Sequence, residues 1–100
     1  MTRPLPKKFM DLRDSYLGDE SWEEFADCFN VNEKEVLRIA NNLGVSQSVA
    51  KVIGWHIREK YSEQWFNKKI PVLHNFRPVD LIKNYVDGEI CLRVILQQMH

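Results

Sequence analysis

The sequence predicts an all-α protein, a compact bundle of about five to six helices, and three observations lead to this fold class. Apolar residues recur every three or four positions along most of the 100-residue chain, the spacing that lines one face of an α-helix. Residues typical of helix starts and helix ends separate these stretches. No segment alternates apolar and polar residues between turn signals, so we expect no sheet.

The N-terminal part predicts two short helices. The first lies within residues 9–17 and ends at Gly18. Ser21 and Glu24 have the spacing of a capping box, in which the two side chains bond free backbone N–H groups at a helix start. This pair predicts a second helix over residues 21–29, with apolar residues at helical spacing.

The centre of the chain, about residues 33–56, predicts a helix-turn-helix-like unit. Asn32 is placed to cap its first helix, and Gly44 to close that helix in the left-handed conformation. Ser46 can cap the second helix, which has enough apolar residues at helical spacing to run as far as Trp65.

The C-terminal part predicts two helices after an irregular segment. Pro71 and Pro78 bracket that segment, and Pro78 suits the first turn of a helix over residues 78–86. Asp87-Gly88 breaks this helix, and a last helix covers residues 90–99. We divide the chain into a helical N-terminal part, residues 1–60, and a C-terminal domain, residues 61–100.

Charge and composition narrow the classes of function. Basic and acidic side chains balance at 14 each, which argues against bulk attraction to nucleic acid or to a membrane surface. Residues 1–50 carry six basic and nine acidic side chains, whereas residues 51–100 carry eight and five. There is no apolar run of about 18 residues to span a membrane, and two cysteines make no disulfide framework. We therefore expect a cytoplasmic protein without a membrane partner.

The residues of known catalytic and metal sites do not occur in the required spacings. His56, His74 and His100 are far apart, and no His-Glu-x-x-His or Cys-x-x-Cys pattern indicates zinc. Cys91 lies on an apolar helical stripe, and the four glycines form no phosphate-binding loop. We predict no enzyme activity, no metal and no cofactor.

The helix-turn-helix-like unit leaves DNA binding open as an alternative. If its second helix entered a DNA groove, Gln47, Ser48 and Lys51 would face the bases. Of these three, only Lys51 is basic, and a single cation neutralises few of the phosphate charges that DNA binding requires. This alternative function is that of a small helix-turn-helix, DNA-binding transcriptional regulator.

The stretch from Trp65 to Leu96 has the most specific pattern. The large side chains of Trp65 and Phe66 end one helix, and the proline-containing segment after them is expected to fold back onto them. Pro78 then starts another helix, with Asp80 in its first turn, where a carboxylate interacts favourably with the helix dipole. This predicts a helix–loop–helix cap with its own small core. The positions that define the pattern are Trp65-Phe66, Leu73, Pro78, Asp80, Leu81-Ile82, Gly88 and Val94-Ile95-Leu96.

This pattern resembles the toxin-binding domain of the Xre/MbcA/ParS antitoxins. That family has a Trp-Leu pair, a Leu, a Pro, an acidic residue with Leu-Leu, a glycine and a final apolar helix, at spacings that the chain matches. The family usually has Gly-Gly where this chain has His74-Asn75, a Thr or Ser at Arg77, and an arginine near Gln98. Glycine takes positive φ freely, asparagine tolerates it, and histidine does not take it cheaply.

The resemblance implies a bacterial antitoxin whose C-terminal domain binds and occludes a toxin, usually a RES-domain protein that degrades NAD. It implies that the N-terminal part binds operator DNA to repress the operon, and a homodimer is compatible with this arrangement. The residues expected to bind toxin, or to form the core that supports binding, are Trp65, Phe66, Leu73, Arg77, Pro78, Asp80, Leu81, Arg93 and Ile95. Lys68 and Lys69 join Arg77 and Arg93 as cations that would complement an acidic toxin surface.

Overall fold

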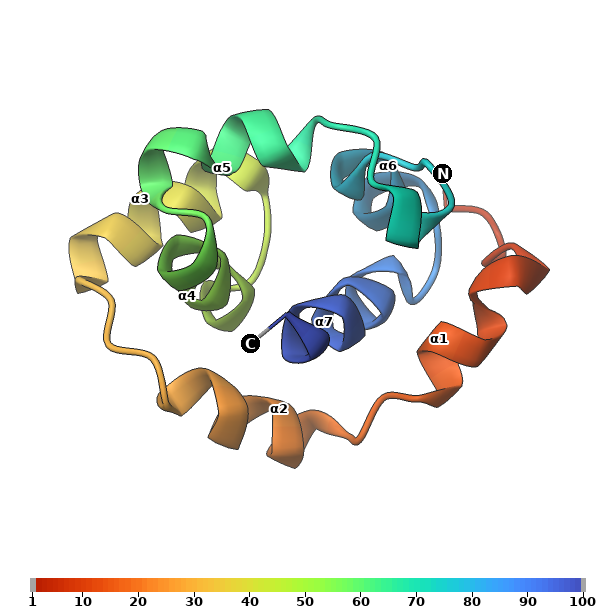
Figure 1. Cartoon of the computed structure of the whole chain (residues 1–100), viewed down its shortest axis with the longest axis horizontal. Coiled ribbons are helices and arrows are strands. Elements are labelled where there is room, and N and C mark those ends of the chain that lie inside the picture. Colours follow the sequence, from red (N-terminus) through yellow and green to blue (C-terminus); the bar gives the residue numbers. More distant parts are fainter. Residues whose placement is uncertain (1, 100) are drawn as a thin grey trace.

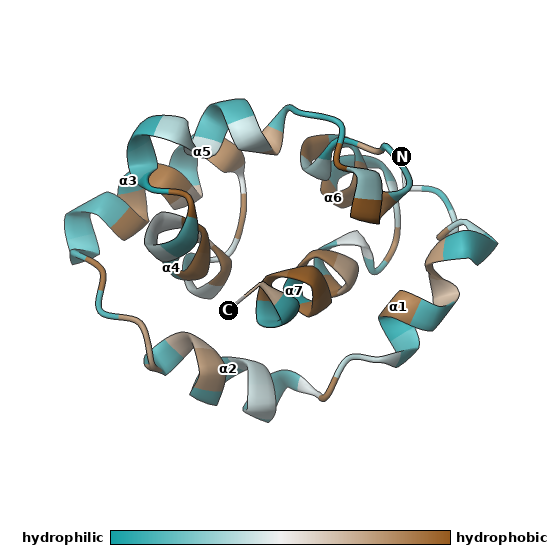
Figure 2. Ribbon diagram, viewed as in Figure 1, coloured by the Kyte–Doolittle hydropathy of each residue, from teal (hydrophilic) through white to brown (hydrophobic). Residues whose placement is uncertain are grey.

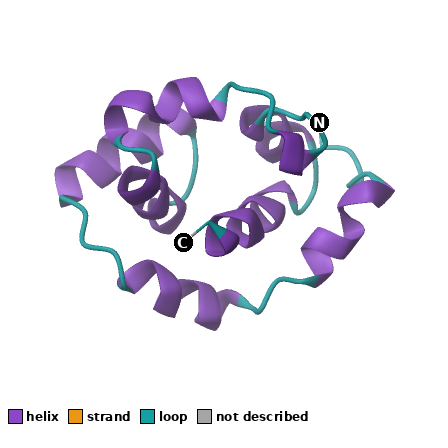
Figure 3. Ribbon diagram, in the orientation of Figure 1, coloured by secondary structure: helices purple, strands orange, loops and turns teal. Residues whose placement is uncertain are grey.

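Helices account for most of the computed structural model, which describes residues 2–99, and no strand forms in this part of the chain (Figures 1 and 3). Two isolated bridges, Arg3 with Tyr85 and Ile70 with Phe76, are the β-type pairings among these residues. Two 3₁₀ turns, Lys7–Phe9 and Pro71–Leu73, accompany seven α-helices. These are α1 Met10–Asp14, α2 Asp19–Asp27, α3 Glu33–Leu43, α4 Gln47–His56, α5 Glu59–Phe66, α6 Pro78–Asn84 and α7 Gly88–Gln98.

The ends of α3 and the start of α4 follow the capping signals of the sequence. The Asn32 side chain accepts a hydrogen bond from the backbone N–H of Lys34, and the Ser46 hydroxyl accepts one from Val49. Gly44 ends α3 with φ of 68°, the left-handed conformation that glycine takes without steric penalty. Local chemistry is therefore sufficient to explain where these two helices meet.

The start of α2 differs from the capping-box prediction. The helix begins at Asp19 rather than Ser21, and Gly18 precedes it with φ of 102°. The Gly18 carbonyl accepts the N–H of Trp22, so Ser21 already lies inside the helix. The first predicted helix is also shorter, because α1 ends at Asp14, before Gly18.

The helix predicted to run from Ser46 to Trp65 is two helices in the structure. It breaks between α4 and α5 at Arg58, whose φ is 69° although arginine has a Cβ. The break redirects the chain across α3, where Nε and Nη2 of Arg38 donate to Glu59 at 2.6 and 2.8 Å. A contact between distant segments therefore accompanies this turn, and no local breaker signals it.

Helix α7 lies in the middle of the molecule and borders two groups of buried apolar side chains (Figures 1 and 2). The first group, which we call the α2–α5 core, joins residues of those helices to Leu92 and Leu96 of α7. The second, the N-terminal/loop core, joins six buried residues from both ends of the chain: Leu5, Phe9, Leu73, Leu81, Cys91 and Ile95. Both cores take residues from each side of residue 60, and the division there stays a prediction. Within residues 2–99, no helix is long and apolar enough to cross a membrane.

Candidate partner-binding site

The structure divides the predicted toxin-binding residues into buried and accessible ones. Trp65 and Phe66 end α5, and Arg93 and Ile95 lie on α7. Leu73 ends the second 3₁₀ turn, while α6 carries the rest of the set apart from Arg77, which precedes it. Five apolar members are buried and therefore hold the shape of the region: Phe66, Leu73, Pro78, Leu81 and Ile95. Trp65 is half-buried against the α2–α5 core.

The loop between α5 and α6 has an unusual backbone. His74 and Asn75 both adopt positive φ, 53° and 63°, at two successive residues other than glycine. The turn is closed by hydrogen bonds from the N–H of Ile70 to the carbonyl of Phe76, and from the N–H of Asn75 to the carbonyl of Ile70. Strain of this kind persists only where surrounding contacts hold the loop in place.

Contacts from the N-terminal segment supply that support. Nε2 of His74 lies 3.1 Å from the carbonyl oxygen of Lys8, and the His74 ring meets the Phe9 ring edge-on at 5.2 Å between centroids. Phe9 is fully buried and also meets the Phe76 ring edge-on. The loop conformation therefore depends on a segment more than sixty residues away in the sequence.

Arg77 and Asp80 form a two-point ion pair at the start of α6. Nε and Nη2 of Arg77 donate to the two Asp80 oxygens at 2.7 and 2.9 Å. The hydrogen bonds from Arg77 lower the pKa of the Asp80 carboxyl below its usual value. The guanidinium is still accessible at the surface, because 43% of the Arg77 side chain is exposed.

Arg93, by contrast, is mostly enclosed. Its guanidinium donates to the Tyr16 hydroxyl at 2.9 Å and to Glu89 at 3.1 Å, and lies 5.2 Å from the centre of the Trp22 ring. Only 14% of its side chain is exposed. Arg93 thus ties α7 to the start of α2, and a partner could reach little of it. Sequence spacing gives no signal for the long-range contact with Tyr16.

A surface groove of about 380 Å³ lies beside the loop, and we call it the loop groove. Its lining combines Lys69, Arg77 and Asp80, which the sequence singled out for binding, with four residues that it did not. Tyr85 belongs to this lining because α6 ends at Asn84, so that Tyr85 continues in extended conformation rather than in the predicted helix. The four additional lining residues are Asn75, Phe76, Asn84 and Tyr85.

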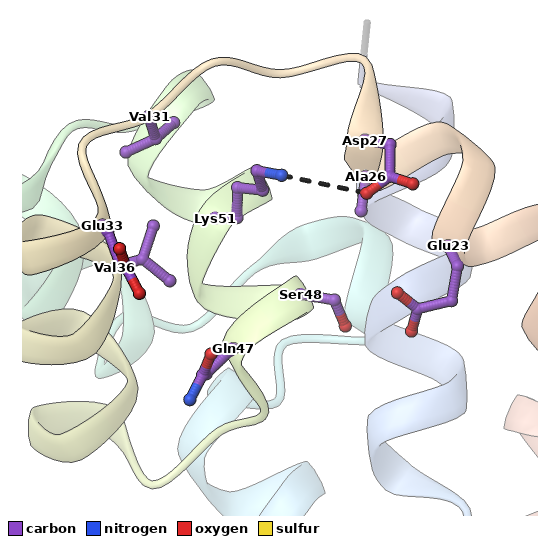
Figure 4. Close-up of a pocket in the computed structure, with 9 residues that line it drawn as sticks. All are labelled: Glu23, Ala26, Asp27, Val31, Glu33, Val36, Gln47, Ser48 and Lys51. Atoms are coloured by element: carbon purple, nitrogen blue, oxygen red, sulfur yellow. Dashed lines mark ion pairs between the residues drawn. The ribbon is translucent and has the colours of Figure 1, made fainter.

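The three residues considered for DNA contact line a different pocket, of about 290 Å³ (Figure 4). The Trp22 indole N–H donates to the Ser48 hydroxyl at 2.8 Å, and Nζ of Lys51 lies 3.9 Å from an Asp27 oxygen. Gln47 is exposed at the rim. The carboxylates that share the lining, those of Glu23, Asp27 and Glu33, would repel a phosphate backbone.

The histidines and Cys91 are the residues considered in the sequence as candidate metal ligands or nucleophiles. No group of three or more His, Cys, Asp or Glu side chains in this range could hold a metal ion. Burial raises the pKa of the Cys91 thiol to about 11, so the thiol is protonated at neutral pH. Nδ1 of His56 faces the Val52 carbonyl, and His100 lies outside the described residues.

Comparison with known proteins identifies no family. No family model, no curated protein and no solved structure matches the chain. The class that can be stated is that of a small protein, all-helical over its described residues, with a groove at a strained surface loop. Any particular function therefore has to be inferred from that loop and its surroundings.

Proposed function

We propose that the chain is a bacterial antitoxin that binds and occludes a RES-type, NAD-degrading toxin through its C-terminal region, in the cytoplasm. The observation that carries this proposal is the positive φ of His74 and Asn75. These two residues stand where the Xre/MbcA/ParS family has Gly-Gly, and glycine is the residue that takes such a conformation without steric penalty.

Positive φ at two successive residues other than glycine is informative because it is unfavourable. A residue with a Cβ in the left-handed region costs roughly 1–2 kcal/mol, less for asparagine. Two such residues in succession are not what local preference would select. Their presence supports a loop whose path is set by its role in the fold, with Leu73 buried on one side and Pro78 starting α6 on the other.

The rest of the C-terminal region suits a rigid binding surface. Leu73, Leu81 and Ile95 are buried together and hold the loop against α6 and α7. The loop groove and the exposed part of Arg77 are left at the surface. A preformed surface loses little conformational entropy on binding, which favours tight occlusion of a partner.

DNA binding is less favoured by the geometry. A three-residue connection with Gly44 joins α3 to α4, which supports a helix-turn-helix-like arrangement. However, Ser48 and Lys51 of α4 are engaged by α2, whose acidic side chains share the pocket. Repression of an operon through α4 would require α2 to move. Steep salt-dependent binding to the chain's own promoter DNA would instead favour the regulator without a toxin.

The proposal is tested by co-expression with the protein encoded next to this chain. We expect that protein alone to arrest growth and deplete cellular NAD, and the full chain to restore both and to co-purify with it. A neighbouring protein that is harmless alone and does not bind the chain overturns the antitoxin function.

A further inference from the structure

Lysine side chains lie at the loop groove and near it. Lys69 lines the groove, and the ammonium group of Lys8 lies 4.7 Å from the centre of the Phe76 ring, which also lines it. Lys83 is near enough to help lower the pKa of Asp80, although its own side chain lines a different pocket. Within residues 2–99, none of these three lysines forms an ion pair.

The carboxylate in the groove does not neutralise these lysines. Both oxygens of Asp80 are bound by Arg77, at 2.7 and 2.9 Å, so this pair contributes little net charge. The charged residues that line the groove, Lys69, Arg77 and Asp80, therefore sum to one positive charge, to which the adjacent Lys8 adds another. An anionic group is the complementary ligand.

The shape of the groove favours acidic side chains over a nucleic-acid strand. Its volume of about 380 Å³ accommodates one or two side chains rather than a run of nucleotides. Lys8 lies over the Phe76 ring, and the rings of Phe9 and Tyr85 pack against it, which leaves less of this ring for a base to stack on. The side-chain amides of Asn75 and Asn84 add donors that suit a carboxylate.

We propose that the loop groove receives the carboxylate side chains of an acidic segment of a protein partner, with Lys8 and Lys69 as the cations that bind them. The inference rests on the proposed function only for the identity of that partner. It assigns the binding to Lys8 of the N-terminal segment together with the loop, rather than to the C-terminal region alone. Arg93, which is mostly enclosed, has no part in it.

The test uses the full chain labelled with ¹⁵N and titrated with a short peptide of alternating aspartate and glycine, followed by backbone NMR shifts. We expect saturable shifts confined to residues 69–85 and the amides near Lys8. The double variant Lys8→Glu, Lys69→Glu should weaken binding by about tenfold or more, because two attractive charges become repulsive.

The matched control is the double variant Lys34→Glu, Lys60→Glu. It changes net charge by the same amount, and Lys60, like Lys8, lies over an aromatic ring. This control should change the affinity by less than about twofold. Circular dichroism and thermal melting of each variant establish that it folds.

Three outcomes would overturn the inference: no shifts, shifts centred elsewhere, or equal weakening by both double variants. Tighter binding of a short oligothymidylate at the same residues would replace it with nucleic-acid binding. The titration needs no toxin, so it is independent of the proposed function. If the peptide binds in the groove but the neighbouring protein is harmless and does not bind the chain, the antitoxin function is refuted and the inference about the groove is retained.

Discussion

The two buried cores of this protein differ in how well local sequence preferences account for the backbone around them. In the α2–α5 core, Asn32, Gly44 and Ser46 end and start helices as their chemistry dictates, and the helices pack where their apolar faces meet. Around the N-terminal/loop core, His74, Asn75 and Asp87 adopt positive φ although each carries a Cβ. In the first core local preference and packing agree except at Arg58, whereas around the second they disagree at three residues, two of them successive.

Long-range contacts explain how the second core tolerates such strain. The N–H of Arg3 donates to the Asn84 carbonyl at 2.8 Å, and the N–H of Val86 donates to Arg3 at 2.9 Å. The N-terminal segment also places Leu5 and Phe9 in the interior. The region proposed to bind a partner is therefore shaped by the opposite end of the chain.

The largest expected effect on stability comes from comparing two glycine-to-alanine substitutions, one beside each core. A Cβ on Gly88 would overlap the backbone carbonyl of Leu81, which cannot move aside without shifting α6, so Gly88→Ala should destabilise the fold by about 4 kcal/mol. In the α2–α5 core, a Cβ on Gly54 would lie 3.1 Å from Cδ1 of Ile39, a side chain that can adjust.

Gly54→Ala is the matched control for that experiment. Helix propensity favours alanine by about 1 kcal/mol, which offsets the crowding and keeps the variant within about 1 kcal/mol of the parent. Urea denaturation measures both. Similar losses of stability for the two variants would contradict this account, in which an added Cβ meets backbone atoms at Gly88 and a side chain at Gly54.

Removing the Phe9 side chain should come next in size. Phe9 is fully buried, so Phe9→Ala should lower the free energy of unfolding by about 3 kcal/mol. Native-state hydrogen exchange should show amides of residues 70–86 losing more protection than those of α3. Equal loss of protection in both regions would mean that the two cores open as one unit.

The buried Cys91 thiol makes the free energy of unfolding depend on pH. Burial raises the pKa of its thiol from 9.0 to about 11, so the unfolded chain loses this proton first. Its contribution to stability is complete below about pH 9 and falls by about 2 kcal/mol as the pH rises to about 11. Unfolding free energies across this range should fall more steeply for the parent than for Cys91→Ala. Identical slopes would rule out a buried, protonated thiol.

The smallest effect concerns the strained loop. Asn75→Gly should stabilise the protein by about 0.5 kcal/mol, because glycine relieves the positive φ, although it also gains freedom when unfolded. Gly44→Ala, at a left-handed residue of the α2–α5 core, should destabilise by about 1 kcal/mol. Thermal melting distinguishes the opposite signs. Destabilisation by Asn75→Gly would show that the asparagine side chain makes a contact worth more than the strain.

The all-helical character and the meeting of α3 with α4 could be predicted, because both depend on periodicity and on capping groups within a few residues. The capping box at Ser21 was wrong, since the carbonyl of Gly18 already accepts the N–H of Trp22. The break at Arg58 was missed because arginine carries no turn signal, and the turn is accompanied by the distant Arg38–Glu59 pair.

The candidate site was predictable only in part for the same reason. Arg77 and Asp80 are three residues apart, and their pairing is a local event. The place of Lys8 beside Phe76 and the enclosure of Arg93 by Tyr16 join segments that no spacing rule connects. The antitoxin function stays a prediction that rests on the loop geometry.

Growth rescue by this chain is the most direct test of the central claim, that its C-terminal region neutralises a protein partner. Cells expressing the protein encoded beside it should stop growing, resume growth with the parent chain or the Lys34→Glu, Lys60→Glu control, and fail to resume with Lys8→Glu, Lys69→Glu. Rescue by all three chains would contradict the role of the loop groove, and a harmless neighbouring protein that the chain does not bind would contradict the antitoxin function itself.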